Sequence, residues 1–394
     1  MTVISGLLVL AGLYLSCYVA YWLLVLVTHF FLSKRSPRTA ASKTRFAIMI
    51  PAYNEELLLP RLLASTRDQD YSSELFDTIV VADNCTDNTA EVARNQGAKV
   101  LERFEQEKRG KGYAINWAIG KIDLDAYDAV LIVDADCTMS TDALRSLDGA
   151  LQERQVVQCY SGVGNPDDSW FTRLLDVSRT INNEIYNPAK QRLGLSSQLL
   201  GTGMCFAAKI LRKYEWDAFT VGEDCEYYAK LLHYGETIGF DGGAKVHHEE
   251  SSSLKQATSQ RMRWSGGRFA IAWRYGFNLM LSGLKERNVV KFDAGLSLVL
   301  PNPSLGMNLT LICFAVALLA TRAGHGIGLA AWFLSLALVQ FGVFVVGVSY
   351  TKNKVSKFMA IFVAPVFLLW KMGIDALSIL GLGRKEWVRT ERNQ

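Results

Sequence analysis

The chain has 394 residues, half of them hydrophobic, and a formal net charge of +4. This length allows two or three domains, and the basic residues cluster beside apolar runs rather than in a patch suited to nucleic acid, which is therefore not expected as a partner. The seven cysteines are odd in number and lack CxxC spacing, so we expect reduced cysteines that mostly pack.

The N-terminal stretch is apolar throughout. No Asp, Glu, Lys or Arg precedes Lys34, and the run from Ile4 to Leu32 is long enough to cross a membrane. A secretory signal peptide would show a basic start and a small-residue cleavage site, and neither is evident. Basic residues follow at once, at Lys34, Arg35, Arg38, Lys43 and Arg45. The positive-inside rule then predicts an outer N-terminus and a cytoplasmic middle region.

Strand and helix patterns alternate in that middle region. Strands are expected at residues 46–50, 77–82, 99–103, 130–137 and 156–161, and helices at 57–67, 86–96, 112–119, 143–153, 170–186 and 222–235. The alternation predicts an α/β domain with a mostly parallel, Rossmann-like sheet. No GxGxxG fingerprint follows the first strand, so a dinucleotide oxidoreductase loses its main support.

The strand expected at 130–137, VLIVDADC, ends in Asp134 and Asp136. Because alternate residues of a strand point to one face, both carboxylates can project where the chain leaves the sheet. Open α/β sheets bind ligands at that edge, and a carboxylate pair there suits a hard divalent cation carrying phosphate oxygens. The alternative is an acidic turn that only ends the strand.

Apolar segments return near the C-terminus, at residues 304–320, 327–350 and 358–382, after a mixed aromatic and basic stretch at 269–284 that is typical of an interfacial helix. Lys371, Asp375 and Ser378 make one polar stripe on the last segment. We therefore expect this segment to lie partly in the membrane interface, with a conventional span as the alternative. The predicted parts are a transmembrane helix (1–33), a cytoplasmic domain (45–268), interfacial helices (269–303), transmembrane or interfacial helices (304–383) and a basic cytoplasmic tail (384–394).

Six motifs occur in order between these apolar parts: PAYNEE, the acid of VADNCTDNT, RGKGYAIN, DAD, GED and QRMRW. The ordered set resembles the membrane-bound family 2 glycosyltransferases, which include the cellulose, chitin and hyaluronan synthases. VADNCTDNTAEVAR, RGKGYAIN, NPDDSW and GTGMCF are most similar to the EpsO-like exopolysaccharide enzymes of bacteria. The resemblance covers residues 46–268. It implies a GT-A fold, Mg or Mn, and inverting transfer from a nucleoside diphosphate sugar, a UDP-sugar, to a growing extracellular polysaccharide at the cytoplasmic face of the inner membrane.

The resemblance also gives roles to matching positions. Asp224 would be the general base, and Asp136 would ligate the metal. The residue types themselves make Asp134 and His247 further candidate ligands. The residues that would contact the donor or the acceptor are Tyr53, Glu55, Asp83, Lys111, Asp134, Gln260, Arg263 and Trp264. These residue types suit the chemistry, since inversion needs a base opposite a leaving diphosphate whose charge is neutralised.

Simpler interpretations stand beside these roles. Asp224 could be an acid favoured at a helix N-terminus, Arg263 and Trp264 could be membrane-interface anchors, Lys111 could be surface charge, and His247 could be structural.

The sequence differs from the processive synthases at two motifs, and both differences weaken the expectation that the product is a long chain. Gly222 replaces the threonine of their TED motif, and WVRTER (387–392) is only a loose counterpart of their gating loop. The alternatives are single-sugar transfer to a lipid-linked acceptor and a non-catalytic, nucleotide-binding scaffold. Intact Asp83, Asp134, Asp136, Asp224 and Arg263 argue against the scaffold. No motif specifies an oligomeric state.

Overall fold

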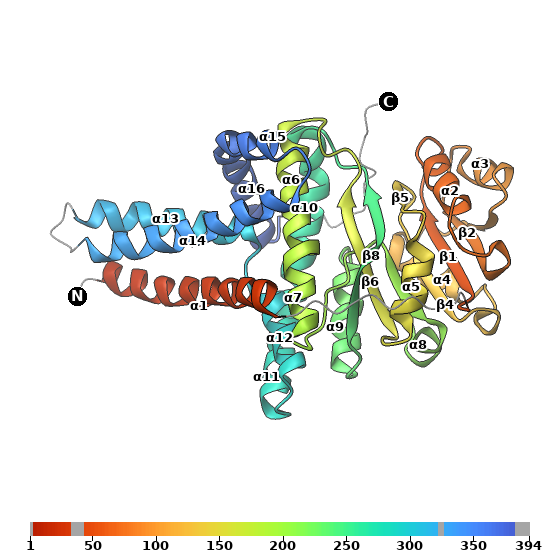
Figure 1. Cartoon of the computed structure of the whole chain (residues 1–394), viewed down its shortest axis with the longest axis horizontal. Helices are drawn as coiled ribbons and strands as arrows, with labels where there is room; N and C mark the ends of the chain where they lie inside the picture. The colour runs from red at the N-terminus through yellow and green to blue at the C-terminus, as the bar shows by residue number, and fades with distance from the viewer. Residues whose placement is uncertain (1–2, 33–42, 322–326, 383–394) are drawn as a thin grey trace.

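The computed structural model describes residues 3–32, 43–321 and 327–382. A domain built on a twisted sheet lies at one end of the molecule and long helices lie at the other (Figure 1). Helices α6 (Trp170–Thr180) and α10 (Leu254–Ile271) run between these two parts, roughly across the direction of the long helices. This arrangement sets a sheet-based site beside a layer of helices.

The sheet has eight strands in the order β3-β2-β1-β4-β7-β6-β8-β5. Strands β3, β2, β1 and β4 are parallel, β7 is antiparallel to both of its neighbours, and β8 is parallel to β6 and antiparallel to β5. The predicted α/β, Rossmann-like half of the sheet is therefore confirmed. The strand bounds are Phe46–Ala52 (β1), Phe76–Asp83 (β2), Lys99–Arg103 (β3), Ala129–Ile132 (β4), Cys137–Met139 (β5), Val156–Val163 (β6), Met204–Ala207 (β7) and Ile238–His248 (β8).

Both faces of the sheet are covered. Along β1, Ala47 and Met49 lie in one hydrophobic cluster, while Phe46, Ile48 and Ile50 lie in the cluster on the opposite face. A strand buried on both sides reads as a continuous apolar run, which is why the pattern of β1 does not alternate. The helices of this domain are α2 (Leu59–Arg67), α3 (Thr89–Asn95), α4 (Lys111–Ile119), α5 (Ala143–Leu151), α8 (Ala208–Lys213) and α9 (Glu223–His233), with short 3-10 turns η1 (Ser73–Leu75) and η2 (Leu124–Ala126).

Two sequence predictions about elements are wrong in extent. The strand expected at 130–137 ends at Ile132, where its pairing with β1 and β7 stops, so Asp134 and Asp136 lie on the turn before β5. The helix expected at 170–186 is α6 followed by a π-helical turn, η3 (Ile181–Tyr186), which leads into α7 (Asn187–Arg192). A strand cannot continue without partners, and an apolar run alone does not reveal where its partners end.

Three long helices run side by side away from the domain (Figure 1): α1 (Val3–Phe31), α13 (Pro303–Thr321) and α14 (Gly328–Tyr350). They pack closely at glycines, since a Cβ on Gly306 would lie 2.6 Å from the ring of Tyr18, and one on Gly12 would lie 2.7 Å from Trp332. Among the described residues, these helices and the segment Lys354–Ile379 are long and apolar enough to span a membrane. All seven cysteines are free, as predicted.

The last described segment has its polar side facing inward. It comprises α15 (Lys354–Met359), η5 (Ala360–Val363) and α16 (Ala364–Ile379). Lys371, Asp375 and Ser378 are buried, while apolar side chains on the other side are exposed, among them Phe362, Val366 and Leu369. Lys371 forms an ion pair with Asp375, and the Ser265 hydroxyl on α10 donates to Asp375 Oδ1 at 2.9 Å. The polar stripe predicted from the sequence thus faces α10.

The stretch expected to be an interfacial helix continues from α10 as a π-helical turn, η4 (Ala272–Gly276), and then α11 (Phe277–Lys285) and α12 (Val289–Val299). The tail that carries the possible gating motif lies outside the described residues.

Candidate active site

Lys111, the first residue of α4, connects two acidic segments of the fold. Its ammonium group forms an ion pair with Asp134, which follows β4, and lies 3.6 Å from Glu223 Oε1 at the start of α9. It also donates a hydrogen bond to the carbonyl oxygen of Gly201 at 2.7 Å. Lys111 is therefore not a surface charge, because it joins the carboxyl end of a central strand to the predicted base region.

The loop of residues 201–203 holds the turn that carries Asp134. Gly201 and Gly203 have φ angles of +82° and +64°, which favour glycine. A Cβ on Gly203 would also lie 2.9 Å from Cys159 Cβ, too close for any other residue without a shift. Between the two glycines, Thr202 Oγ1 accepts the backbone N–H of Asp134 at 3.1 Å. The glycine-bracketed GTG pattern is thus explained by its close approach to the Asp134 turn.

Asp224 lies against the same loop. A Cβ added to Gly201 would be 3.4 Å from Asp224 Oδ2 and 3.9 Å from Lys111 Nζ, so these three groups meet at one point. Asp224 Oδ1 accepts the backbone N–H of Cys225 at 2.8 Å in the first turn of α9. Its other oxygen is the one that faces the shared point, as a base acting on an incoming hydroxyl requires.

The buried carboxyl groups here titrate abnormally. Burial raises the pKa of Asp224, against the lowering effect of the Cys225 N–H and of Lys111. Burial, with smaller contributions from Asp224 and Asp134, raises the pKa of Glu223 to about 7 against the lowering effect of Lys111. Burial acts to lower the pKa of Lys111, but Asp134 and Glu223 raise it well above its usual range, so the ammonium stays charged. Glu223 was not singled out from the sequence, where nothing distinguished it from its neighbour.

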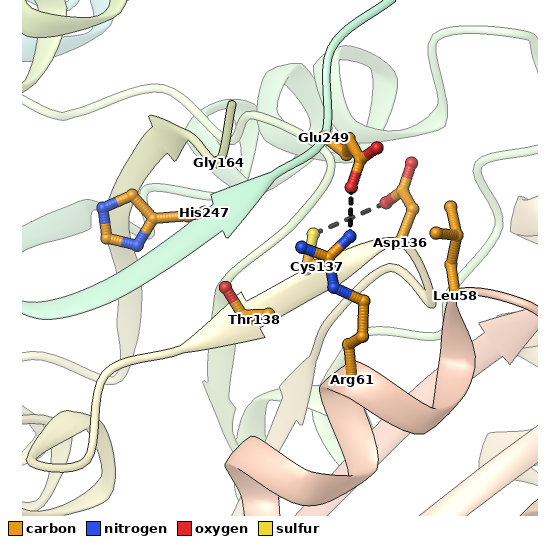
Figure 2. A pocket seen from close by; sticks show the side chains of 8 residues that line it. All are labelled: Leu58, Arg61, Asp136, Cys137, Thr138, Gly164, His247 and Glu249. Atoms are coloured by element: carbon orange, nitrogen blue, oxygen red, sulfur yellow. Dashed lines mark hydrogen bonds and ion pairs between the residues drawn. The ribbon is translucent and has the colours of Figure 1, made fainter. Parts of the chain in front are cut away.

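Asp136 lies in a separate, adjoining pocket (Figure 2). The pocket is lined by Leu58, Arg61, Asp136, Cys137, Thr138, Gly164, His247 and Glu249. Arg61 on α2 forms an ion pair with Glu249, whose backbone N–H donates to the carbonyl oxygen of Asp136 at 3.3 Å. Burial raises the pKa of Asp134, and the negative charge of the Asp136 carboxylate adds to this rise. The two aspartates are therefore neighbours with different partners.

The His247 side chain does not approach the Asp136 carboxylate. Its side chain points away from the aspartate in Figure 2 and packs against Gly162 and the ring of Tyr160. Burial, followed by Lys245, lowers its pKa. Across the described residues, no cluster of three or more His, Cys, Asp or Glu side chains is arranged to hold a metal ion. A cation at Asp136 would therefore take most of its ligands from substrate oxygens and water.

A third group of predicted residues lies where β1 and β2 end. Asp83 is buried, pairs with Arg103 Nη1 at 2.6 Å and accepts from Asn84 Nδ2 at 2.9 Å. Burial raises its pKa against the opposing effect of Arg103. Tyr53 and Glu55 lie in the loop after β1, and the Glu55 N–H donates to Thr89 Oγ1 at 2.8 Å. These residues border the sheet at its carboxyl edge, where a nucleotide would bind.

The QRMRW motif lies in the middle of α10. Burial lowers the pKa of Arg263, while Glu223 and Asp134 raise it, so its guanidinium lies within the field of the central carboxylates. Arg261 stacks on Trp264 with 4.6 Å between guanidinium and ring centroid, and Trp264 stays 36% exposed. The Gln260 side-chain oxygen is buried, and none of the described residues donates to it. Within this motif, Arg263 thus faces the carboxylates, and Trp264 offers a partly exposed aromatic ring.

The structure brings Lys111, Asp134 and Asp224 together and sets Arg263 in their field, with Asp136 in the next pocket. Residues not predicted from the sequence complete the surroundings: Arg61, Arg179, Thr202, Glu223, Glu249, Glu250 and Arg261. The QRMRW motif could have drawn attention to Arg261. The GED and GTGMCF motifs likewise contain Glu223 and Thr202. The other four carry no local signal, because their partners lie far along the chain.

Comparisons with known proteins found similarity to glycosyltransferases. The model of the family described as "Glycosyltransferase like family 2" matches residues 44–267. Probable glycosyltransferase YdaM of Bacillus subtilis is 23% identical over 63% of this chain and 60% of its own length. Beta-monoglucosyldiacylglycerol synthase of Synechocystis is 24% identical over 58% of this chain and 49% of its own length. The chain thus spans roughly half of the length of the curated relatives that it matches.

Among solved structures, the mannosyltransferase PcManGT from Pyrobaculum calidifontis, in complex with GDP-Man and Mn2+, is similar with a TM-score of 0.56. The match covers 94% of this chain and 99% of that chain at 18% sequence identity. A likeness at this identity supports the GT-A type of fold.

Proposed function

We propose that this chain, which belongs to the glycosyltransferase-like family 2, transfers a sugar from a nucleoside diphosphate donor to an acceptor hydroxyl with inversion at the anomeric carbon. The observation that carries the proposal is the meeting of Lys111, Asp134 and Asp224 at Gly201. A buried carboxylate beside a fixed ammonium, at the ligand-binding edge of the sheet, is the arrangement that general base catalysis next to a phosphate site requires.

Asp224 acts as the base in this proposal. It takes the proton of the acceptor hydroxyl as that oxygen attacks the anomeric carbon opposite the leaving diphosphate. The raised pKa of Asp224, caused first by its burial, makes it a better proton acceptor than an exposed aspartate. The positive charge of Lys111 opposes this rise in the pKa of Asp224, which favours the ionised form that a base needs.

The leaving diphosphate would be held by Asp136 through a divalent cation and by Arg263. A magnesium or manganese ion usually takes one or two carboxylates and completes its shell with phosphate oxygens and water, which fits the donor set around Asp136. Such a cation neutralises charge on the leaving group. Arg263 offers a guanidinium that matches phosphate oxygens bidentately. Asp134, next to Lys111, would contact the ribose or the diphosphate.

The remaining roles follow the order of residues along the sheet edge. Tyr53, Glu55 and Asp83 would contact the base and ribose, which fits their place after β1 and β2. Trp264 offers a partly exposed ring on which a sugar could stack, and Gln260 has a buried oxygen that can accept from a ligand hydroxyl. We propose UDP as the nucleotide.

The acceptor we propose is a growing extracellular polysaccharide, with a lipid-linked sugar as the second candidate. An observation favours the second: the segment 354–379 buries Lys357, Lys371 and Asp375 and exposes its apolar side. Such a surface is stable only against lipid or another apolar partner. The name of the Synechocystis relative also refers to a lipid product.

The same exposed apolar side supports a membrane location. In this proposal the chain lies in the inner membrane as a multi-pass protein, with its sheet domain in the cytoplasm. Residues 1–33 cross the membrane, 45–268 catalyse, 269–303 lie in the interface, and the last apolar segment lies in the interface with the tail 384–394 on the cytoplasmic side.

The test is release of UDP by purified protein in detergent with Mg or Mn, over UDP-glucose, UDP-GlcNAc and UDP-galactose. One donor is expected to react. Asp224→Asn should lower transfer by at least about 10²-fold while UDP affinity stays nearly intact, because only the base is lost. Asp217→Asn, which changes an exposed aspartate paired with Lys230, is the matched control. Appreciable transfer by Asp224→Asn would remove Asp224 from the base role, and UDP binding without release from any donor would favour the scaffold.

A further inference from the structure

Glu250, just after β8, is one carboxylate that faces two guanidiniums and a histidine. Its carboxylate is 1% exposed. Oε1 accepts His248 Nε2 at 2.8 Å and Oε2 accepts Arg261 Nη2 at 2.7 Å. Arg179 Nη2 lies farther away, 3.7 Å from Oε1. The backbone of Glu250 is fixed as well, since its N–H and carbonyl oxygen both bond to the Asn165 side chain at 2.9 Å.

Arg179 is the neighbour left without a close acceptor. Its side chain, on α6, is 21% exposed, and its polar contacts within the described residues are with Glu250 and with His248 Nε2 at 3.4 Å. An ionised carboxylate only accepts, so His248 Nε2 must donate to Glu250 and cannot also accept from Arg179. A guanidinium carries five N–H donors. Most of the donors of Arg179 are therefore available to a ligand.

Arg179 and Arg261 lie beside the ring proposed to hold the acceptor. Arg261 lies between Glu250 and the ring of Trp264, with 4.6 Å between its guanidinium and the ring centroid. Burial lowers the pKa of Arg179, and the charge of Glu250, its nearest counter-charge, acts in the opposite direction. Two largely buried guanidiniums therefore share a single carboxylate, next to the ring on which the acceptor sugar would stack. An anion at this place would balance the charge and supply the missing hydrogen-bond acceptors.

We infer that Arg179, with Arg261 beside it, binds a phosphate group carried by the acceptor, in a subsite next to Trp264. The inference rests on the proposed function, and it adds that the acceptor is an anion. Phosphate fits because its oxygens match a guanidinium bidentately. The phosphate could belong to a membrane lipid or to a soluble sugar phosphate.

The surroundings of α6 favour the lipid. Phe171 on α6 packs against Phe367 and Trp370 of α16, at ring-centroid distances of 6.0 and 5.5 Å. Lys357 of α15 pairs with Asp176 on α6 at 2.8 Å. The helix that carries Arg179 is thus fastened to the segment whose other side is apolar and exposed. A lipid lying along that segment could present its headgroup to Arg179.

The experiment titrates the full-length protein in a neutral detergent with three probes: farnesyl phosphate, farnesol and inorganic phosphate. Calorimetry is run with and without UDP and Mn. We expect farnesyl phosphate to bind more tightly than either other probe. Arg179→Gln should weaken its binding by about tenfold to a hundredfold, since a charge-assisted hydrogen bond is lost. Arg179→Lys, which keeps the charge, should restore part of the affinity.

The control is Arg173→Gln, on the same helix, where the guanidinium donates to the carbonyl oxygen of Asp167 at 3.2 Å. It should leave the binding of farnesyl phosphate unchanged. If inorganic phosphate binds as tightly as farnesyl phosphate and equally needs Arg179, the subsite stands and its natural ligand is soluble.

Three results would overturn the subsite. Farnesol binding as tightly as farnesyl phosphate would show that no anion is recognised. Unchanged binding in Arg179→Gln would remove the residue from the site. A loss of UDP affinity in this variant would mean that Arg179 holds the donor. These outcomes are separate from the proposed function, which fails if the wild-type protein does not bind UDP, because the titration without nucleotide still decides the subsite.

Discussion

Replacing Lys111 with methionine is expected to move the acidic limb of the pH–rate profile for sugar transfer to higher pH. The ammonium group pairs with Asp134, lies 3.6 Å from Glu223 Oε1 and lowers the pKa of Asp224. Methionine keeps an unbranched side chain of similar length, so the change removes the charge while filling most of the volume. The three carboxyl groups then lose the cation that keeps them ionised.

The size of the effect follows from the distance. Two unit charges 3.6 Å apart interact by about 4 to 5 kcal/mol at an effective dielectric constant of about 20, which corresponds to about 3 pKa units. Water and Arg263 would compensate in part, so we expect a shift of at least about one unit. The sign is upward: the pKa of Glu223 is already about 7 with Lys111 in place, and losing a stabilising positive charge raises the pKa of Glu223 and Asp224 further. Activity is then lost at a higher pH than in the wild type.

The assay measures kcat from UDP release across acidic and neutral pH. The donor is kept at saturating concentration, so that weaker donor binding does not affect the measured rate. Lys111→Arg should keep the acidic limb in place. Lys121→Met, which removes an exposed lysine just after α4, should change nothing. If Lys111→Met lowers kcat without moving the limb, the lysine acts on the nucleotide alone and the electrostatic reasoning is wrong.

Two further changes test neighbouring parts of the site. Asp136→Ala should abolish the Mn-dependent part of UDP affinity; equal affinity with and without Mn in both wild type and variant would contradict a metal at Asp136. Glu250→Ala should destabilise the protein by about 3 to 5 kcal/mol, because it leaves buried guanidiniums without a counter-charge, and thermal unfolding would show this. Glu249→Ala, which breaks the more exposed ion pair with Arg61, should cost about 0 to 1 kcal/mol, and similar losses in both variants would refute the distinction.

The sequence predicted the elements of the sheet better than their ends. The alternation of apolar runs and helical patterns gave β1 to β4 in order, because each strand and helix carries its own local pattern. It misplaced the end of β4, since Val133 continues the apolar run although pairing with β1 and β7 stops at Ile132. The short strand β5 could not be foreseen, because only its pairing with β8 makes it a strand.

The choice between His247 and His248 shows a similar limit. Adjacent residues of a strand point to opposite faces, so only one of the two can contact Glu250, and the register of β8 decides which. His248 pairs with Cys137 in the ladder and contacts Glu250, whereas His247 turns toward Tyr160. A one-residue shift in that register would reverse the outcome, and the sequence gives no information on the register.

Predicted site residues came from short motifs, whereas the residues that hold them are scattered. Arg179 and Glu250 are 71 positions apart in the chain and meet only because α6 lies beside the end of β8. No local pattern distinguishes either from a surface charge. Arg179 and Glu250 stand out only by their burial and by the number of hydrogen-bond donors and acceptors around them. Both quantities are defined only in the folded molecule.

Helix α10 connects the last described helix, α16, to the site through its two faces. Thr258, Arg261 and Ser265 are spaced by three and four residues and share one face, where they bond to Trp370, Glu250 and Asp375 respectively. The opposite face carries Gln260, Arg263 and Gly267.

The approach at Gly267 gives the unusual Gly222 a physical reason. A Cβ on Gly267 would lie 3.1 Å from the backbone nitrogen of Gly222, so α10 meets the start of α9 backbone to backbone. A threonine at position 222 would place its branched side chain toward this contact, since its Cβ would already lie 3.6 Å from Gly267. The contacts with α16 and Glu250 therefore set how α10 presents Arg263 to the carboxylates, and the glycine pair sets how closely it approaches the start of α9.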